Sequence, residues 1–269
     1  MKEKNEDFQP QFRGFFNTPH LFLNPVFDLQ PFTKRPDKDF VFNGTMPENI
    51  RLGQRVERFV SSELLQLKNI EILSENYQVR NEKITIGELD CLCLEDGNPI
   101  HLEIQFKYYL YDESLGETEI DHCVGPMRRD TLNEKLDKLK NKQLPLLYAK
   151  ETKPLLEQLK LKAADLTQYI YFKAQLFIPF GKQITLKTLN NDCIYGFYFN
   201  YTDLNQFEDC KFYKPKKTDW LLDLDTNVNW LTYEQITQQL DTYKAENYAP
   251  MLWLKYPKGE MNKCFVVPW

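Results

Sequence analysis

The stretch Ile84-Thr-Ile-Gly-Glu-Leu-Asp-Cys-Leu-Cys-Leu-Glu-Asp-Gly-Asn-Pro-Ile-His-Leu-Glu-Ile-Gln-Phe-Lys107 decides the fold of this chain. Its middle, Asp96-Gly97-Asn98-Pro99, is a tight-turn signal, and runs rich in apolar residues flank that turn on both sides. We therefore predict an antiparallel β-hairpin over residues 84–107.

The two strands of this hairpin each carry a charged face. Side chains alternate along a strand, so Glu88 and Asp90 share one face, as do Glu103, Gln105 and Lys107 on the second strand. If the register sets both polar faces on one side, Asp90 and Glu103 converge, which is costly unless a cation neutralises them. Mg²⁺ is the natural occupant, held by carboxylates, a backbone carbonyl and waters. The alternative is a solvated face with ordinary charges.

A helix is expected before the hairpin. Thr45-Met-Pro-Glu48 has the spacing of a capping box, and apolar residues follow at helical intervals over residues 52–67. Glu57 lies at the margin of that apolar stripe, with the small residues Gly53 and Ser61 one turn away on either side. Its carboxylate therefore has space beside it, although a surface glutamate is the alternative.

Helices and strands alternate through the rest of the chain. A helix is predicted over residues 131–143, with a cluster of lysines that includes Lys135, and another over residues 153–166. Strands are expected before the hairpin at 70–73 and 77–79, and later at 169–178, 193–201, 251–255 and 264–267. This order predicts a mixed α/β sheet flanked by helices. We expect an N-terminal arm over residues 1–44 and one domain with a C-terminal α/β extension over residues 45–269.

The whole pattern resembles a known nuclease superfamily. The order of elements is similar to the PD-(D/E)XK, restriction-endonuclease-like fold. It consists of a helix glutamate, a strand with Gly87-Glu-Leu-Asp90, a turn, a second strand with Leu102-Glu-Ile104 and a further helix. The resemblance implies that Asp90 and Glu103 bind Mg²⁺ or Mn²⁺ and that Glu57 is a supporting acid.

The chain more closely resembles the bacterial domain-of-unknown-function family 1853, which is grouped with that superfamily. The similar segments are Leu52-Gly-Gln-Arg-Val-Glu57, Ile86-Gly-Glu-Leu-Asp90, His101-Leu-Glu103 to Lys107-Tyr-Tyr-Leu110, and Gly125-Pro-Met-Arg-Arg-Asp130-Thr-Leu with Lys135 and Gln143 beyond.

One position departs from the superfamily pattern. Gln105 stands where a lysine usually orients the attacking water and offsets charge in the transition state. Either Gln105 serves directly, or Lys107 on the same face reaches back, which we favour, or catalysis has been lost. The resemblance implies that Asp130, Lys135 and Gln143, which lie around the following helix, contact the scissile phosphate or position the metal site. The alternatives are an N-cap for Asp130 and solvated surface for the other two.

These residues predict a Mg²⁺-dependent phosphodiesterase that acts on nucleic acid. The alternative is an inactive nuclease-fold protein that binds nucleic acid or a protein partner. No Walker loop, dinucleotide fingerprint or Gly-x-Ser-x-Gly motif occurs, so we expect no nucleotide cofactor.

Composition limits the kind of partner and the location. The net charge of −5 argues against a protein that coats nucleic acid non-specifically, because phosphate neutralisation drives such binding. The six cysteines follow no regular framework and are expected to be buried thiols. The chain opens with mixed charges and contains no long apolar run, so we expect a cytoplasmic protein without a membrane segment.

Overall fold

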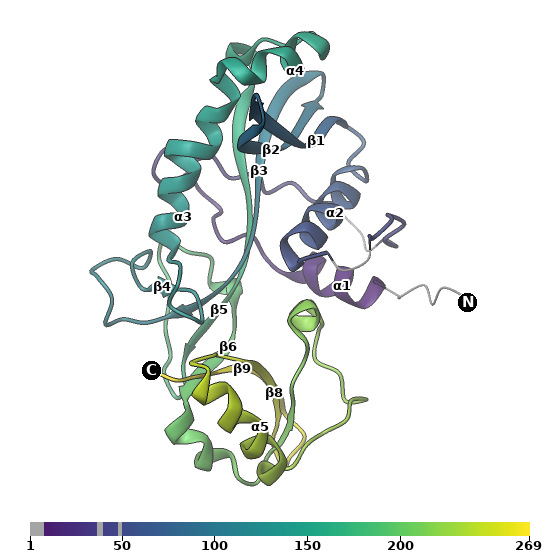
Figure 1. Cartoon of the computed structure of the whole chain (residues 1–269). Coiled ribbons are helices and arrows are strands. Elements are labelled where there is room, and N and C mark those ends of the chain that lie inside the picture. The colour runs from purple at the N-terminus through teal and green to yellow at the C-terminus, as the bar shows by residue number, and fades with distance from the viewer. Residues whose placement is uncertain (1–7, 37–39, 48–49) are drawn as a thin grey trace. The chain divides into compact units, whose positions relative to one another are not determined.

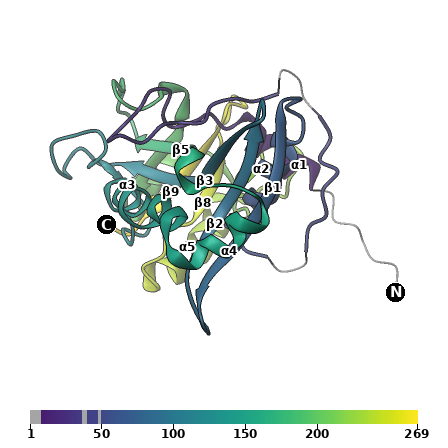
Figure 2. The ribbon, with the colours of Figure 1, turned by 90° about the horizontal axis from the view of Figure 1, so that it is seen from above.

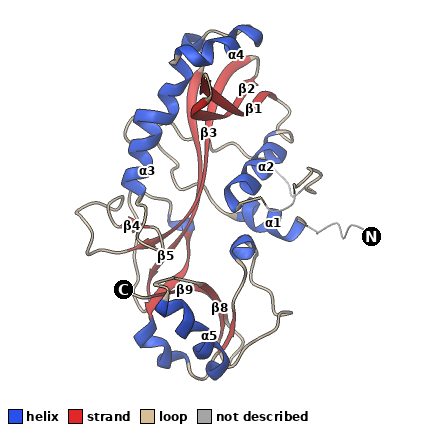
Figure 3. Ribbon diagram, viewed as in Figure 1, coloured by secondary structure: helices blue, strands red, loops and turns tan. Residues whose placement is uncertain are grey.

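The computed structural model describes residues 8–36, 40–47 and 50–269 of the chain and has a mixed α/β fold (Figure 3). A large mixed sheet flanked by helices has the strand order β1-β2-β3-β5-β6-β9-β8-β7, with β4 paired to β3. The chain divides into two compact units. Unit 1 takes in the chain up to Pro19, Lys107–Leu132 and Ala174–Trp269, and unit 2 takes in His20–Phe106 and Asn133–Lys173.

Unit 2 holds the predicted hairpin. Its strands are β1 (Ile70–Asn81), β2 (Ile84–Glu95) and the first parts of β3 (Asn98–Tyr111) and β5 (Thr167–Pro179). Its helical segments are α2 (Leu52–Leu64), α3 (Leu132–Lys138), the π-helical turn η1 (Leu139–Gln143), α4 (Lys153–Gln158) and the short 3₁₀ turns η2 (Leu144–Tyr148), η3 (Lys150–Thr152) and η4 (Ala163–Asp165). In Figure 1, α3 runs along one side of β3 and α2 lies on the other.

The hairpin prediction is confirmed. Strands β2 and β3 pair antiparallel, and the two residues between Glu95 and Asn98 have positive φ, 50° at Asp96 and 80° at Gly97. Positive φ at both central residues defines the type I′ turn that matches the twist of a hairpin. Figure 2 shows β1, β2 and β3 side by side.

Strand β1 is longer than the sequence indicates. Residues 70–73 and 77–79 were predicted as separate strands, but they belong to one strand whose register with β2 shifts between Ile72 and Ser74. Asn76 takes a positive φ of 51° within it. A register shift of this kind bends the strand locally and increases its twist without ending it.

The predicted start of the first long helix is wrong. The stretch 45–47 is not helical, and Glu48 lies outside the described residues. Helix α2 begins at Leu52, where the side chain of Gln54 accepts a hydrogen bond of 3.2 Å from the backbone N–H of Arg51. This later capping interaction satisfies a backbone donor at the helix start.

A buried polar cluster connects α2 to β5 within unit 2. The carboxylate of Glu63 accepts hydrogen bonds from Tyr171 Oη at 2.9 Å and from Lys173 Nζ at 3.1 Å. Both charged side chains are almost fully buried. The His20 ring packs edge-on against Tyr171, 4.7 Å between centroids. Burial and the neighbouring Lys173 lower the pKa of His20 to about 3.

The part of the N-terminal arm in unit 2 runs along β5. Leu21 and Phe32 donate backbone hydrogen bonds to the carbonyls of Phe172 and Ile170, at 2.8 and 2.9 Å. The arm therefore extends the backbone hydrogen bonding of the unit as well as packing on it.

Unit 1 is built around the other strands. It contains α1 (Gln9–Asn17), β4 (Cys123–Val124), the ends of β3 and β5, β6 (Ile194–Asn200), β7 (Lys211–Tyr213), α5 (Tyr233–Ala245), β8 (Met251–Lys255) and β9 (Met261–Val267), with 3₁₀ turns η5 (Asn191–Cys193), η6 (Tyr201–Phe207) and η7 (Lys217–Leu221). Strands β5, β6 and β9 are parallel, and Phe199, Phe212, Ile236 and Leu252 belong to one buried core.

Two further expectations concern the whole chain. The six cysteines are free and buried, as predicted. In the described residues, every helix is too short or too polar to cross a membrane.

Candidate functional site

Asp90 and Glu103 lie at the centre of unit 2, on paired strands. The last paired residues of the hairpin are Leu92 with His101 and Cys91 with Leu102, so the next step of the same register sets Asp90 opposite Glu103. Asp90 Oδ2 accepts a hydrogen bond of 2.7 Å from the backbone N–H of Ile104. Asp90 is 9% exposed and Glu103 is fully buried, so this face is not the solvated surface of the alternative interpretation.

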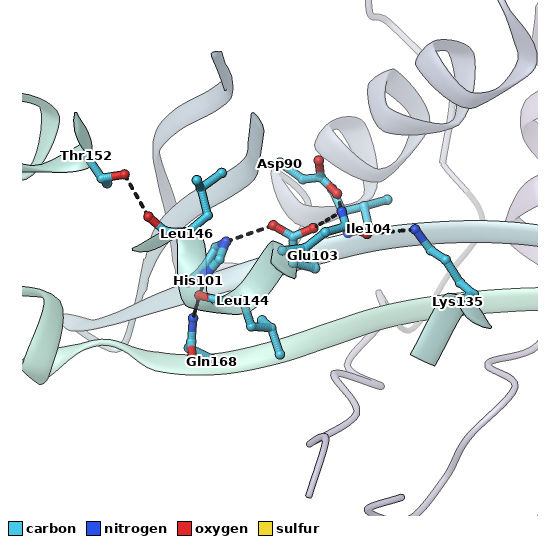
Figure 4. A network of polar contacts seen from close by, with 10 residues as sticks. Asp90, His101, Glu103, Ile104, Lys135, Leu144, Leu146, Thr152 and Gln168 are labelled. Atoms are coloured by element: carbon cyan, nitrogen blue, oxygen red, sulfur yellow. Dashed lines mark hydrogen bonds and ion pairs between the residues drawn. The ribbon is translucent and has the colours of Figure 1, made fainter. Parts of the chain in front are cut away.

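Both oxygens of Glu103 are held by neighbouring side chains. His101 Nε2 lies 3.1 Å from Oε1, and Gln143 Nε2 donates to Oε2 at 2.6 Å. The other ring nitrogen of His101 lies 2.9 Å from Nε2 of Gln168, whose amide also donates to the carbonyl of Leu144 at 2.7 Å. Figure 4 shows the contacts of His101 with Glu103 and Gln168, and the second oxygen of Asp90 directed away from Ile104.

These contacts fix the protonation of His101. Because the Gln168 amide nitrogen is a donor, Nδ1 of the ring is the acceptor and Nε2 carries the proton that is donated to Glu103. Burial lowers the pKa of His101 to about 4, so the ring is neutral at pH 7. A neutral His101 therefore orients the Glu103 carboxylate without cancelling its charge.

Three carboxyl groups of unit 2 have raised pKa values. Burial, followed by the charge of Glu103, raises the pKa of Asp90 to about 7. Burial also raises the pKa of Glu103 to about 7 against the opposing effect of Lys135. Glu57 on α2 reaches about 7 through burial and the charge of Asp90. All three carboxyl groups therefore change between their protonated and ionised forms near neutral pH.

Lys135 and Gln143 approach the carboxylates from the helix. Lys135 Nζ donates to Gln143 Oε1 at 2.8 Å, and its charge favours the ionised forms of both Asp90 and Glu103. These residues are eight positions apart, which is about 2.2 turns of α-helix, so a straight helix would separate them by roughly 80° around its axis. The wider π-helical turn η1 absorbs this excess and brings both side chains to one side.

The remaining predicted residues have other surroundings. Lys107 and Asp130 form an ion pair of 2.6 Å, and both belong to unit 1. Lys107 thus has a carboxylate partner other than the predicted pair. Gln105 is half-buried on β3. The structure therefore brings Glu57, Asp90, Glu103, Lys135 and Gln143 together in unit 2.

The carboxylate oxygens of Asp90 and Glu103 are the type of ligand that a hard divalent cation prefers. Each carboxylate oxygen can accept more than one interaction, so the hydrogen bonds to Glu103 leave lone pairs for a metal. Among the described residues, no group of three or more His, Cys, Asp or Glu side chains is gathered to hold a metal ion by itself. A cation bound here would need water or substrate oxygens to complete its shell, as is usual for Mg²⁺.

Two residues of this network were not predicted from the sequence. His101 precedes Glu103 by two positions on the same strand, and this spacing is the signal that places both side chains on one face. Gln168 carries no such signal, because its contact with His101 joins residues 67 positions apart.

Comparison with known families gives a match over most of the chain. The family described as a domain of unknown function, DUF1853, matches residues 34–267. No curated protein and no solved structure matches the chain. Since the matched segment includes the hairpin, α2, α3 and every residue of the site, we conclude that the chain belongs to the DUF1853 family.

Proposed function

We propose that this protein is a Mg²⁺-dependent phosphodiesterase acting on DNA or RNA, with Asp90 and Glu103 as the metal ligands. The observation that carries the proposal is their position opposite one another on paired strands, buried and held by hydrogen bonds to Ile104, His101 and Gln143. The similarity to the PD-(D/E)XK pattern in the sequence adds support.

A bound cation would offset the repulsion between the two buried carboxylates of the site. Two buried carboxyl groups with pKa values near 7 retain protons at neutral pH, and a divalent cation would replace those protons. Asp90 and Glu103 would hold Mg²⁺, which when bound would supply Lewis-acid chemistry toward the phosphate and water.

Lys135 is the best candidate for the missing lysine of the pattern. Its Nζ donates to the amide oxygen of Gln143, and its charge acts on both carboxylates, whereas Lys107 is paired with Asp130. We assign to Lys135 the orientation of the phosphate and the offset of its developing negative charge. Glu57, with a pKa of about 7, would accept a proton from the attacking water.

A cleavage assay tests this proposal. Purified full-length protein is incubated with labelled single- and double-stranded DNA and RNA in Mg²⁺, Mn²⁺ or EDTA. Asp90→Asn retains an oxygen to accept from Ile104, so it removes the charge with little change of shape. Glu71→Gln is the matched control, because Glu71 is an exposed carboxylate on β1. We expect metal-dependent cutting that Asp90→Asn abolishes and Glu71→Gln leaves unchanged; cutting that survives Asp90→Asn would sink the assignment.

A second candidate is a nuclease-fold protein that binds nucleic acid or a protein partner without cutting. The observation that favours it is Gln105 at the lysine position, together with hydrogen bonds to both oxygens of Glu103. Metal binding measured by titration with Mn²⁺ separates the two candidates. Binding of Mn²⁺ without cleavage of any of the four substrates favours the non-catalytic protein.

A further inference from the structure

An aromatic side chain lies at the tip of a tight turn in unit 2. Val26 and Leu29 exchange both backbone hydrogen bonds, at 3.1 and 2.8 Å. The two residues between them, Phe27 and Asp28, have φ values of 48° and 65°. These values define a two-residue turn of the I′ type.

Phe27 is an unfavourable residue for this position. Type I′ turns favour Asn, Asp or Gly, because bulky side chains are strained at positive φ. Asp28 fits this preference, but Phe27 does not. Burial does not compensate for the strain, since the side chain of Phe27 is 52% exposed. A strained residue that exposes an aromatic ring indicates a binding role.

The ring of Phe27 forms one wall of a pocket against the helix that follows the site. The pocket has a volume of about 310 Å³ and is also lined by Asn133, Leu136, Asp137, Lys140 and Asn141. Lys140 Nζ forms an ion pair of 2.8 Å with Asp28 Oδ2, which ties the turn to the helix. The pocket thus combines an apolar wall with amide and carboxylate groups at its edge.

The same helix offers charge for a phosphate backbone. Lys138, Lys140 and Lys142 are exposed along α3 and η1, and Lys140 is paired with Asp28. Gln143 donates to Glu103 of the candidate site, and Lys135 donates to Gln143. This helical segment therefore carries exposed cationic side chains as well as residues of the pocket and of the candidate site, in a chain whose net charge is −5. This local positive charge complements a nucleic acid strand.

We propose that this pocket holds an unpaired nucleobase of a single-stranded nucleic acid, stacked on Phe27. Asn133 and the hydrogen-bonded pair Asn141 and Asp137 lie beside the polar edge of the base, and the exposed side chains of Lys138 and Lys142 contact the flanking phosphates. Stacking on an aromatic ring does not depend on the identity of the base, because every base has a π-face. This inference rests on the proposed function and specifies its substrate as single-stranded.

The test measures binding without cleavage. Fluorescence anisotropy in EDTA records the affinity of the full-length protein for a labelled single-stranded oligonucleotide and for the same backbone with abasic positions. Phe27→Asn removes the ring and fits the turn, so it keeps or raises the melting temperature. Phe27→Tyr keeps the ring. Leu23→Asn is the matched control, since Leu23 is an exposed apolar residue of the same segment, 59% exposed.

We expect Phe27→Asn to bind the oligonucleotide about tenfold more weakly and the abasic strand equally well, while Phe27→Tyr and Leu23→Asn bind like the parent chain. Equal affinity of Phe27→Asn and the parent would overturn the proposal. A parent chain that binds neither strand would also overturn it, and would leave a protein partner as the occupant of the pocket.

Failure of this inference is distinguishable from failure of the nuclease proposal. If Phe27→Asn weakens binding but the parent chain never cuts in Mg²⁺ or Mn²⁺, the base pocket is supported and the nuclease proposal is rejected. If the parent chain cuts and Phe27→Asn binds as tightly as the parent, the nuclease proposal is supported and the base pocket is rejected.

Discussion

Gln143, at the end of a helix, donates a hydrogen bond of 2.6 Å to Glu103, a buried strand residue 40 positions earlier in the chain. The same amide group accepts from Lys135 at 2.8 Å. One glutamine side chain therefore links the cationic and anionic sides of the candidate site.

Gln143→Ala should weaken Mn²⁺ binding by roughly 10- to 100-fold, because partners that orient a ligand carboxylate have effects of this size. Titration calorimetry measures the affinity. Gln158→Ala, an exposed glutamine on α4, is the control and should bind Mn²⁺ like the parent. An unchanged affinity for Gln143→Ala would mean that Gln143 does not position Glu103 for a metal.

Lys135→Met should reduce cleavage by roughly 100-fold or more, since loss of a group that stabilises transition-state charge has effects of this order. Lys107→Met, chemically the same change, should reduce it by less than about threefold, because Lys107 is paired with Asp130. Initial rates at saturating Mg²⁺ provide the comparison. The reverse order of effects would restore Lys107 as the lysine of the site.

Mn²⁺ affinity should rise with pH and level off above about pH 7. The metal competes with protons on Asp90 and Glu103, whose pKa values are both about 7, so each acid must lose its proton before it binds the cation. Titrations at several pH values between 5.5 and 8.5 test this. An affinity independent of pH would contradict the assignment of these two carboxylates.

Acid should destabilise the protein through His20. The pKa of His20 is about 3 in the folded chain and 6.5 when unperturbed, so below pH 6.5 the unfolded state binds the proton and the folded state does not. Stability is therefore lost as pH falls from 6.5 towards 3, by about 2 kcal/mol at pH 5 from this residue. Urea unfolding of His20→Gln at pH 7 and pH 5 should show a correspondingly smaller loss; an equal loss would assign the acid sensitivity elsewhere.

Lys173→Met should destabilise the fold by roughly 3–5 kcal/mol, because it leaves the buried Glu63 carboxylate without its cation. The double variant Glu63→Leu with Lys173→Met should recover much of that loss, since both charges of this buried pair are removed together. Urea unfolding of the parent, the single variant and the double variant gives the comparison. Equal stability of Lys173→Met and the parent would contradict the stabilising role assigned to this ion pair.

The hairpin could be predicted from the sequence because its determinants are local. Asp96-Gly97 fixes the turn, the turn fixes the register, and alternation then sets Asp90 opposite Glu103. Their burial could not be predicted this way, because it depends on helices that follow tens of residues later.

Other parts of the site depend on long-range or irregular structure. The contact of His101 with Gln168 joins distant residues, and the helix start at Leu52 depends on a cap that competes with the stronger signal at Thr45. Lys135 and Gln143 were singled out in the sequence, but ideal helical periodicity places them on different faces.

The π-helical turn η1 makes the site sensitive to chain length. A π turn contains one residue more than the α turn it replaces, so it is equivalent to a single-residue insertion in a helix. Deletion of Asn141 would allow this segment to become regular α-helix with Lys135 and Gln143 seven positions apart, which is within roughly 20° of alignment, so both side chains would stay on one side of the helix. A one-residue insertion in this helix adds about 100° of rotation and would therefore disconnect Gln143 from Glu103, whereas a one-residue deletion is absorbed when the π turn becomes regular α-helix.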